Sequence, residues 1–201
     1  MKADFKKETP GYRARAGVFE VIDIPPLRFL MIDGHGDPNE QLYGDAVSTI
    51  FTVAYRLKFL SKRELDRDYV VMPLEALWWS GDMASFTTAR DKSHWHWTAL
   101  NLVPEWITNE QFERVRSDAG ARMPDSLRLD TYDEGRCAQT LHLGRFDDEG
   151  PVLDEMHHVY IPGQGLRMTG KHHEIYLSDI RRTDPSKLRT ILRQPVADAA
   201  G

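Results

Sequence analysis

The sequence predicts an α+β fold made of two halves, in each of which a strand is followed by a helix and two more strands. The first observation behind this is a helical spacing of apolar residues over 44–60, between extended segments at 28–34 and 68–80. The second is that a strand followed by a helix appears again from residue 136 onwards. The third is a hydrophobic fraction of 41% with 28% charged residues, which is ordinary for a globular protein. We therefore expect duplicated β-α-β-β halves, related by a pseudo-two-fold axis, around a central ligand cleft.

The first half is expected to span about residues 18–123 of a single domain. In chain order it should contain strands at 18–24 and 28–34, a helix at 44–60, strands at 68–80 and 94–103, and a helix at 109–119. Pro73 indicates an edge or bulge position in its strand, because proline cannot donate to a ladder. Thr108 and Gln111 have the spacing of a capping box. Residues 1–16 are polar and basic and should form either an ordered arm or a frayed tail.

The second half is expected to span about residues 127–196. It should contain strands at 127–130 and 136–144, a helix at 151–160, a turn at 163–165, and strands at 166–177 and 189–196. The two halves share almost no sequence identity, so the expected duplication lies in the pattern of elements alone.

Charge and cysteine content exclude several classes of protein. The net charge of −5 gives no basic surface for nucleic acid or for an anionic membrane. The chain has no apolar run near the roughly 20 residues that span a bilayer, and no apolar segment follows the charged N-terminus as in a signal peptide. Cys137 stands alone, which rules out an internal disulfide and indicates a reducing compartment. We expect a cytoplasmic monomer or homodimer.

A strand at 172–177 carries the chemistry that stands out most. Side chains alternate along a strand, so His172, Glu174 and Tyr176 point to one face and the residues between them point to a mostly apolar face. A carboxylate on an internal strand needs a partner. Glu174 could form a salt bridge with Lys171 or Arg181. It could equally lie at the floor of a pocket, where it would pair with a cationic ligand or act as a general base on water.

A second acid occupies the matching strand of the first half. Pseudo-symmetry would bring Glu75 and Glu174 towards one cleft, where one acid could stay protonated while the other is ionised. The alternative is that Glu75 pairs with a buried arginine. His142, on the first strand of the second half, could orient a ligand or a water beside Glu174, or could be a hydrogen-bonded core residue.

Aromatic residues are abundant on the strands next to these acids. An aromatic wall beside a carboxylate holds flat or cationic ligands by stacking and by cation–π attraction of about 0.5 to 2 kcal/mol per contact. Tryptophan is also a common core residue because of its bulk. The side chains expected to line the ligand site are Tyr43, Trp79, Trp95 and Trp97.

No metal and no cofactor are expected. His94 and His96 would share one face of a strand, which suits zinc or copper, but the sequence has no HExxH motif and no cysteine pair. It also has no GxSxG nucleophile elbow, no complete dinucleotide loop and no Walker lysine. Since no helix-turn-helix with basic flanks precedes the domain, direct binding to nucleic acid is not expected either.

Three segments resemble the GyrI-like small-molecule-binding proteins: residues 170–196, 71–79 and 141–149. The resemblance implies the duplicated fold with a central pocket, into which a glutamate at the position of Glu174 would face. It implies binding of planar, aromatic or cationic molecules. It also implies a possible hydrolase, because some stand-alone members open the cyclopropane of DNA-alkylating compounds. Glu174 would then activate water, while Tyr176 and His142 would bind the ligand. The alternative is a drug-sequestering, sensing or topoisomerase-interacting module that does no chemistry.

Overall fold

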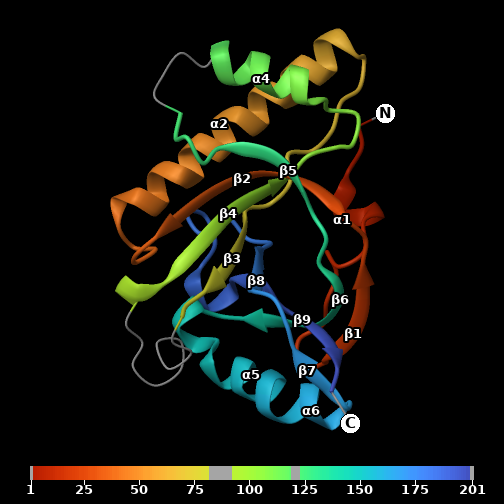
Figure 1. Ribbon diagram of the computed structural model, residues 1–201, viewed down its shortest axis with the longest axis vertical. Coiled ribbons are helices and arrows are strands. Elements are labelled where there is room, and N and C mark those ends of the chain that lie inside the picture. Colours follow the sequence, from red (N-terminus) through yellow and green to blue (C-terminus); the bar gives the residue numbers. More distant parts are fainter. Residues whose placement is uncertain (1, 82–91, 119–122, 200–201) are drawn as a thin grey trace.

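The computed structural model describes residues 2–81, 92–118 and 123–199 and has an α+β fold around one large antiparallel sheet (Figure 1). The strands are β1 (Glu20–Ile24), β2 (Leu27–His35), β3 (Glu75–Trp79), β4 (His96–Leu102), β5 (Arg128–Tyr132), β6 (Gly135–Leu143), β7 (Leu166–Met168), β8 (His172–Tyr176) and β9 (Arg189–Asp198). Their order in the sheet is β1-β6-β9-β8-β3-β4-β2-β5, with β7 added to β9 outside this path.

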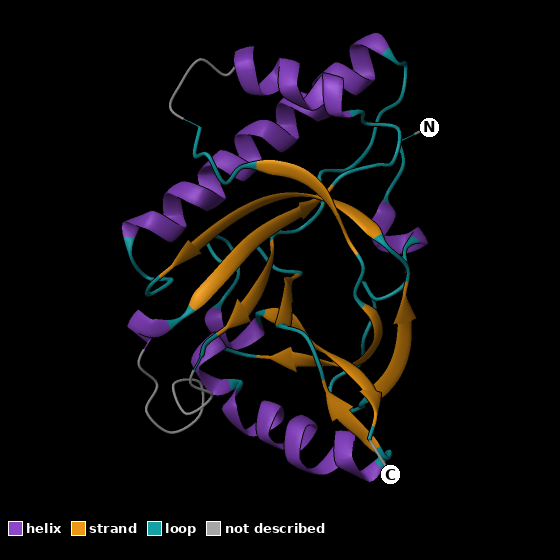
Figure 2. Cartoon of the chain, viewed as in Figure 1, coloured by secondary structure: helices purple, strands orange, loops and turns teal. Residues whose placement is uncertain are grey.

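The helices lie outside the sheet (Figure 2). They are α1 (Phe5–Glu8), α2 (Gln41–Glu64), α4 (Asn109–Asp118), α5 (Gly150–Glu155) and α6 (Ile161–Gly163), with a π-helix, η3 (Met156–Tyr160), between the last two. Short 3-10 turns are η1 (Lys92–His94), η2 (Phe146–Asp148) and η4 (Pro185–Lys187). The capping box of α4 is confirmed, because the backbone N of Thr108 donates to Gln111 Oε1 at 2.9 Å and the backbone N of Gln111 donates to Thr108 Oγ1 at 3.2 Å.

Two strands are shorter than the sequence predicts. The strand expected at 68–80 is regular only over β3, so Pro73 lies before it rather than within it. The side chain of Asn101 donates to the carbonyls of Met72 and Pro73 at 2.7 and 3.0 Å, which replaces ladder hydrogen bonds there. The strand expected at 166–177 divides into β7 and β8, because Gly170 between them has a φ of +60° that extended backbone cannot accommodate.

The sheet joins two sets of strands through one contact. The order β6-β9-β8 on one side meets β3-β4-β2 on the other through the antiparallel pair of β3 and β8. Ala76 pairs with Glu174 in this contact and Trp78 pairs with His172. The register therefore fixes which side chains of the two sets share a face. The duplication of the halves stays a prediction.

The two faces of the sheet bury different cores. Helix α2 covers one face of the first set of strands, where it packs Ile50 and Leu57 against Leu30 and Ile32. Segments α5, η3 and α6 cover the same face of the second set (Figure 1). On the opposite face the sheet curls around a third cluster, to which six of its strands contribute: Phe29, Met31, Leu77, Leu100, Leu102, Leu141, Ile175 and Ile191. We call these the outer face and the inner face.

The N-terminal segment is an ordered arm and not a frayed tail. Ala3 forms a β-bridge with Tyr69, and Ala16 forms one with Leu141. Between these points Tyr12 enters the inner core, where it is only 5% exposed. Among the described helices, none combines the length and the apolar character that a membrane span requires.

Candidate functional site

The candidate site lies at the middle of the outer face, around Glu174. The hydroxyl of Tyr176 donates to Glu174 Oε2 at 2.7 Å and accepts a hydrogen bond from Trp78 Nε1 at 3.2 Å. His172 Nε2 lies 3.5 Å from Glu174 Oε1. These side chains come from β3 and β8, whose register turns them to the same face. The phenol thus orients one carboxylate that is largely shielded from solvent, and the imidazole lies beside it.

An aromatic wall stands beside this carboxylate. Tyr43, from α2, lies 5.5 Å from the ring of Trp78 and 5.0 Å from the ring of Trp97, and Trp95 lies 5.7 Å from Trp78. The Trp97 ring fits because Gly34 is its neighbour on β2, where a Cβ atom would come within 2.2 Å of the indole. The sequence therefore forms a wall of four aromatic rings against the Glu174–Tyr176 pair.

A second carboxylic acid, Glu149, borders the site from the start of α5. It is 4% exposed. The turn that carries it packs on the site, because Phe146 lies edge-on to the ring of Tyr176 at 5.4 Å. Burial raises the pKa of Glu149 to about 10, and the charge of Glu174 and contact with the Thr190 hydroxyl also act on it. Thr190 is paired in register with Tyr176. Glu149 is therefore protonated at neutral pH.

Several buried polar atoms around these acids lack a hydrogen-bond partner of ordinary geometry within the part of the chain that the structure describes. They are Tyr43 Oη, Trp97 Nε1, Glu149 Oε1, His157 Nε2, both ring nitrogens of His172 and Thr190 Oγ1. Buried polar groups are nearly always satisfied in native proteins, by protein atoms, water or a ligand. Their concentration around Glu174 indicates a place that a polar guest completes.

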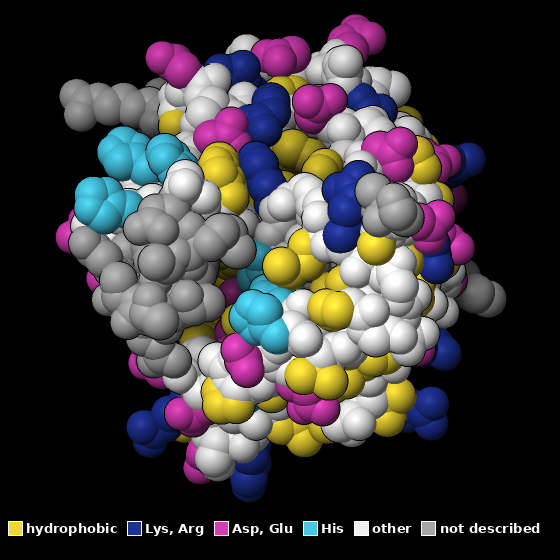
Figure 3. Space-filling model, turned by 60° about the horizontal axis from the view of Figure 1, so that its bottom comes forward, with side chains coloured by type: hydrophobic (Ala, Val, Ile, Leu, Met, Phe, Trp, Pro, Cys, Tyr) yellow, Lys and Arg dark blue, Asp and Glu magenta, His cyan; other side chains and the backbone are white. Residues whose placement is uncertain are grey.

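Burial also shifts the pKa values of two phenols and one histidine of the site. Burial and then the charge of Glu174 raise the pKa values of both Tyr43 and Tyr176, so these phenols stay protonated. Burial, with the neighbouring His172, lowers the pKa of His157 to about 4. His157 belongs to the π-helix η3, and its ring lies 6.1 Å from the ring of His172. Figure 3, which views the side that carries α5 and α6, shows two groups of histidines on this face.

A second cluster of ionisable groups lies across the sheet, on the inner face. His173 Nε2 is 3.0 Å from Glu75 Oε2, and His173 Nδ1 is 2.9 Å from Glu134 Oε1. Arg193 donates to Glu134 Oε2 at 2.8 Å, and the Tyr12 hydroxyl donates to Glu75. Two acids and two bases thus lie within ion-pair distance of one another in the interior, although His173 Nε2 makes no hydrogen bond of ordinary geometry within the described chain.

Protonation in this network follows from its pairing. Despite burial, Glu134 beside His173 and Arg193 has its pKa lowered to about 2. Despite burial, His173 between Glu134 and Glu75 has its pKa raised to about 9. Arg193 also donates to the carbonyl of Gly11 at 2.6 Å, which ties the N-terminal arm to the network. The network holds the arm and the inner core together.

The register corrects one expectation about the predicted site. Ala76, not Glu75, is paired with Glu174, so the expectation that Glu75 and Glu174 reach one cleft is wrong. Trp79 points to the same inner face as Glu75. Its ring stacks on His96 at 5.6 Å and lies 3.3 Å from Lys171 Nζ. Strands β3 and β8 turn Glu75 and Glu174 to opposite faces, because Glu75 is paired with Ile175 and Glu174 with Ala76.

His142 has its own structural partner. It is 5% exposed, and its Nε2 lies 2.9 Å from the carbonyl oxygen of Arg145. The register places it beside Thr190, which in turn is beside Tyr176. Its ring therefore fixes the turn that leads to Glu149, at the edge of the site.

Of the predicted residues, the structure brings together Tyr43, Trp95, Trp97, Glu174 and Tyr176. Sequence reasoning missed four others: Trp78, Glu149, His157 and His172. The alternation of the strand at 172–177 already placed His172 on the face of Glu174. Glu149 and His157 had no such signal, because their helical segment meets the site only through tertiary packing.

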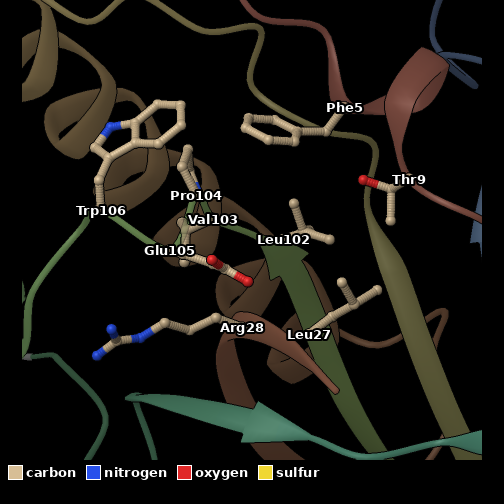
Figure 4. A pocket seen from close by; sticks show the side chains of 9 residues that line it. All are labelled: Phe5, Thr9, Leu27, Arg28, Leu102, Val103, Pro104, Glu105 and Trp106. Atoms are coloured by element: carbon tan, nitrogen blue, oxygen red, sulfur yellow. The ribbon is translucent and has the colours of Figure 1, made fainter. Parts of the chain in front are cut away.

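Other possible sites are separate from this one. Across the described ranges, no group of three or more His, Cys, Asp or Glu side chains is arranged to hold a metal ion. A cavity of about 160 Å³ lies where the N-terminal arm meets the segment after β4 (Figure 4). It is lined mainly by apolar side chains, among them Phe5, Leu102 and Trp106, and none of the residues around Glu174 lines it.

Comparison with known proteins identifies relatives over nearly the whole chain. An uncharacterized conserved protein from Listeria innocua is 38% identical, with a TM-score of 0.87, over 98% of this chain and 100% of that one. A hydrolase from Listeria innocua is 37% identical, with a TM-score of 0.84 and the same coverage. The C-terminal domain of EcmrR, at 9% identity and a TM-score of 0.56, covers 90% of this chain and 98% of that one and shares the fold alone.

No curated protein matches the chain. The GyrI-like small molecule binding domain matches residues 18–197, which include every side chain around Glu174 described above. The chain therefore belongs to the GyrI-like small molecule binding domain family.

Proposed function

We propose that this protein binds planar aromatic or cationic small molecules at Glu174 and hydrolyses strained electrophiles among them. The observation that carries the proposal is the carboxylate of Glu174, held by Tyr176 at 2.7 Å beside an aromatic wall. An ionised acid next to a flat apolar surface attracts a cationic or electron-poor ring. Two Listeria innocua structures that are 37% and 38% identical to this chain are described as hydrolases, which supports the proposal that this protein is also a hydrolase.

Binding would use the unpartnered donors of the site. Tyr43 and Trp97 would stack on or border a flat guest, and Trp97 Nε1 would donate to an acceptor on it. Trp78 would hold Tyr176 in place rather than contact the ligand by its nitrogen, because that nitrogen already donates to the phenol. We further propose that the two sets of strands joined at β3 and β8 are the duplicated halves, with the ligand where they meet.

Hydrolysis would be the addition of water across a strained carbon–carbon bond. Glu174 takes a proton from water as the oxygen attacks a ring carbon of a carbonyl-conjugated cyclopropane. The bond that breaks sends its electron pair to the carbonyl oxygen, which takes a proton from Tyr176 or Glu149. Release of ring strain supplies driving force, so positioning and proton transfer are what the site contributes. His142 would act as a positioning residue for the turn that carries Glu149.

The test is turnover of a cyclopropane-containing DNA-alkylating compound, followed by chromatography, for the wild type and Glu174→Gln. General acid–base groups typically contribute 10²–10⁴-fold, so we expect about that loss of ring-opened product. The control is Glu155→Gln on the exposed side of α5, which should retain full turnover. Binding is followed separately, by quenching of tryptophan fluorescence.

Two outcomes would change the proposal. If neither protein changes the compound but both show quenching, the protein is a binder that sequesters or senses such molecules, and the hydrolase part is wrong. If Glu174→Gln turns over the compound at the wild-type rate, another group is the base.

A further inference from the structure

We propose that Glu149 is a second recognition acid of this site, which gives up a proton when a cationic ligand binds, so that binding of cations is coupled to proton release. This inference rests on the proposed binding function, but not on catalysis. It concerns a residue for which neither the sequence pattern nor the match to known proteins assigns a role.

The first step in the argument is the position of Glu149. It ends the turn that begins at Phe146, whose ring packs on Tyr176, and it contacts Thr190, the neighbour of Tyr176 across β8 and β9. The side chain is 4% exposed and its Oε1 atom has no hydrogen-bond partner among the described residues. Glu149 is thus a buried acid at the edge of the region around Glu174, in contact with Thr190.

The second step is the charge balance of that region. Two carboxylates in one buried site repel each other, so one of the two carboxyl groups retains its proton. The groups that act on Glu149 from the elements around it are Glu174, Asp147 and Lys92, and Tyr176 lies between the two acids. Lys92 already forms an ion pair with Asp147 at 3.3 Å. The charge of Glu174 is therefore the main local reason, after burial, that Glu149 holds a proton.

The third step is the effect of a cation. A positive ring that contacts Glu174 cancels the repulsion between the acids and attracts a second negative charge. The protonated Glu149 then ionises, its proton passes to the solvent, and the site carries two carboxylates against one ligand cation. A neutral ligand of the same shape supplies no such attraction, and Glu149 remains a hydrogen-bond donor to it.

Thermodynamic linkage between ligand binding and proton release fixes the direction and the size of the expected change of affinity with pH. If binding releases about one proton, the affinity for a cation rises about tenfold for each unit of pH below the pKa of free Glu149. The affinity for a neutral ligand does not depend on pH in the same range. The phenols of Tyr43 and Tyr176 have raised pKa values and do not release protons at pH 8.

The experiment uses two ligands that share a ring system, N-methylacridinium, a permanent cation, and acridine, which is uncharged at pH 8. Titration calorimetry of the full chain at pH 8, in buffers of different ionisation enthalpy, counts the protons released. We expect about one proton for N-methylacridinium and none for acridine. Glu149→Gln should still bind both ligands, but should release no proton and lose the pH dependence. Asp148→Asn, which removes the adjacent exposed acid, is the matched control and should behave as the wild type.

Three results would overturn the inference. Binding of N-methylacridinium without proton release would show that Glu149 keeps its proton or is ionised already. Equal release from wild type and Glu149→Gln would assign the proton to another group, such as His172. If neither ligand binds the wild type, the proposed binding function fails, and the inference fails with it.

Discussion

The inner and outer faces of one sheet carry two acid clusters with opposite properties. On the inner face, Glu75 and Glu134 are matched by His173 and Arg193, and the network is buried and paired. On the outer face, Glu149 and Glu174 lie among phenols, indoles and two histidines, and several polar atoms lack partners among the described residues. Burial is similar in both places, so the clusters differ in the charges that surround their acids, which fits a structural role for the inner cluster and the proposed ligand binding at the outer one.

The sharpest test of this comparison is a substitution that breaks the buried inner network, set against one that breaks an exposed ion pair. Glu134→Gln leaves His173 and Arg193 buried with only Glu75 to balance them, and removal of one partner of a buried ion pair costs about 3 to 5 kcal/mol. Urea unfolding should show this loss in the free energy of unfolding. Asp198→Asn, which breaks the exposed pair with Arg136, should cost less than about 1 kcal/mol. An equal cost for both variants would contradict a structural role for the inner network.

The two clusters should also differ in how they make the free energy of unfolding depend on pH. The pKa of Glu134 is lowered from 4.5 to about 2, so its contribution is present above pH 4.5 and is lost as the pH falls towards 2. The pKa of His173 is raised from 6.5 to about 9, so its contribution is complete below pH 6.5 and is lost as the pH rises through 9. Maximal stability should therefore lie between these windows.

Denaturant unfolding from pH 3 to pH 9.5 measures this profile. In Glu134→Gln both slopes should flatten, because the acid is gone and His173 loses its main partner. Unchanged slopes in that variant would mean that other groups set the pH dependence.

The effect of Glu149 should have the opposite sign. The pKa of Glu149 is raised from 4.5 to about 10, so the folded chain must keep a proton that the unfolded chain releases, and folding is penalised increasingly as the pH rises from 4.5. Glu149→Gln removes this penalty. We expect a gain in the free energy of unfolding at pH 8, which linkage limits to about 5 kcal/mol, because each pKa unit corresponds to about 1.4 kcal/mol.

The control for this gain is a comparison across pH. At pH 4 Glu149 is protonated in both states of the chain, so the wild type and Glu149→Gln should unfold at nearly the same urea concentration. A loss of stability in Glu149→Gln at pH 8 would show that the acid has a structural partner and would remove the contrast between the two faces.

Relations within a strand or a helix could be predicted from the sequence, because they follow from local geometry. The α+β class, helix α2, the capping box of α4 and the common face of His172, Glu174 and Tyr176 all depend on residues that are near one another in the chain. The abundance of aromatic side chains and the resemblance of residues 170–196 to GyrI-like proteins also came from the sequence, and the match over 18–197 confirms the family.

Only the tertiary structure decided which acids meet. The pairing of Ala76 with Glu174 turns Glu75 inward, and a shift of one residue would have reversed this. The partners of Glu75, which are Tyr12 and His173, come from the arm and from β8, and nothing local in the sequence joins them. Glu149 reaches the site because the turn after β6 packs on Tyr176. The sequence shows which residues of a strand share a face, but it does not show how that strand is aligned with its neighbour. The alignment of β3 with β8 turned Glu75 into the core and left Glu174 on the outer face.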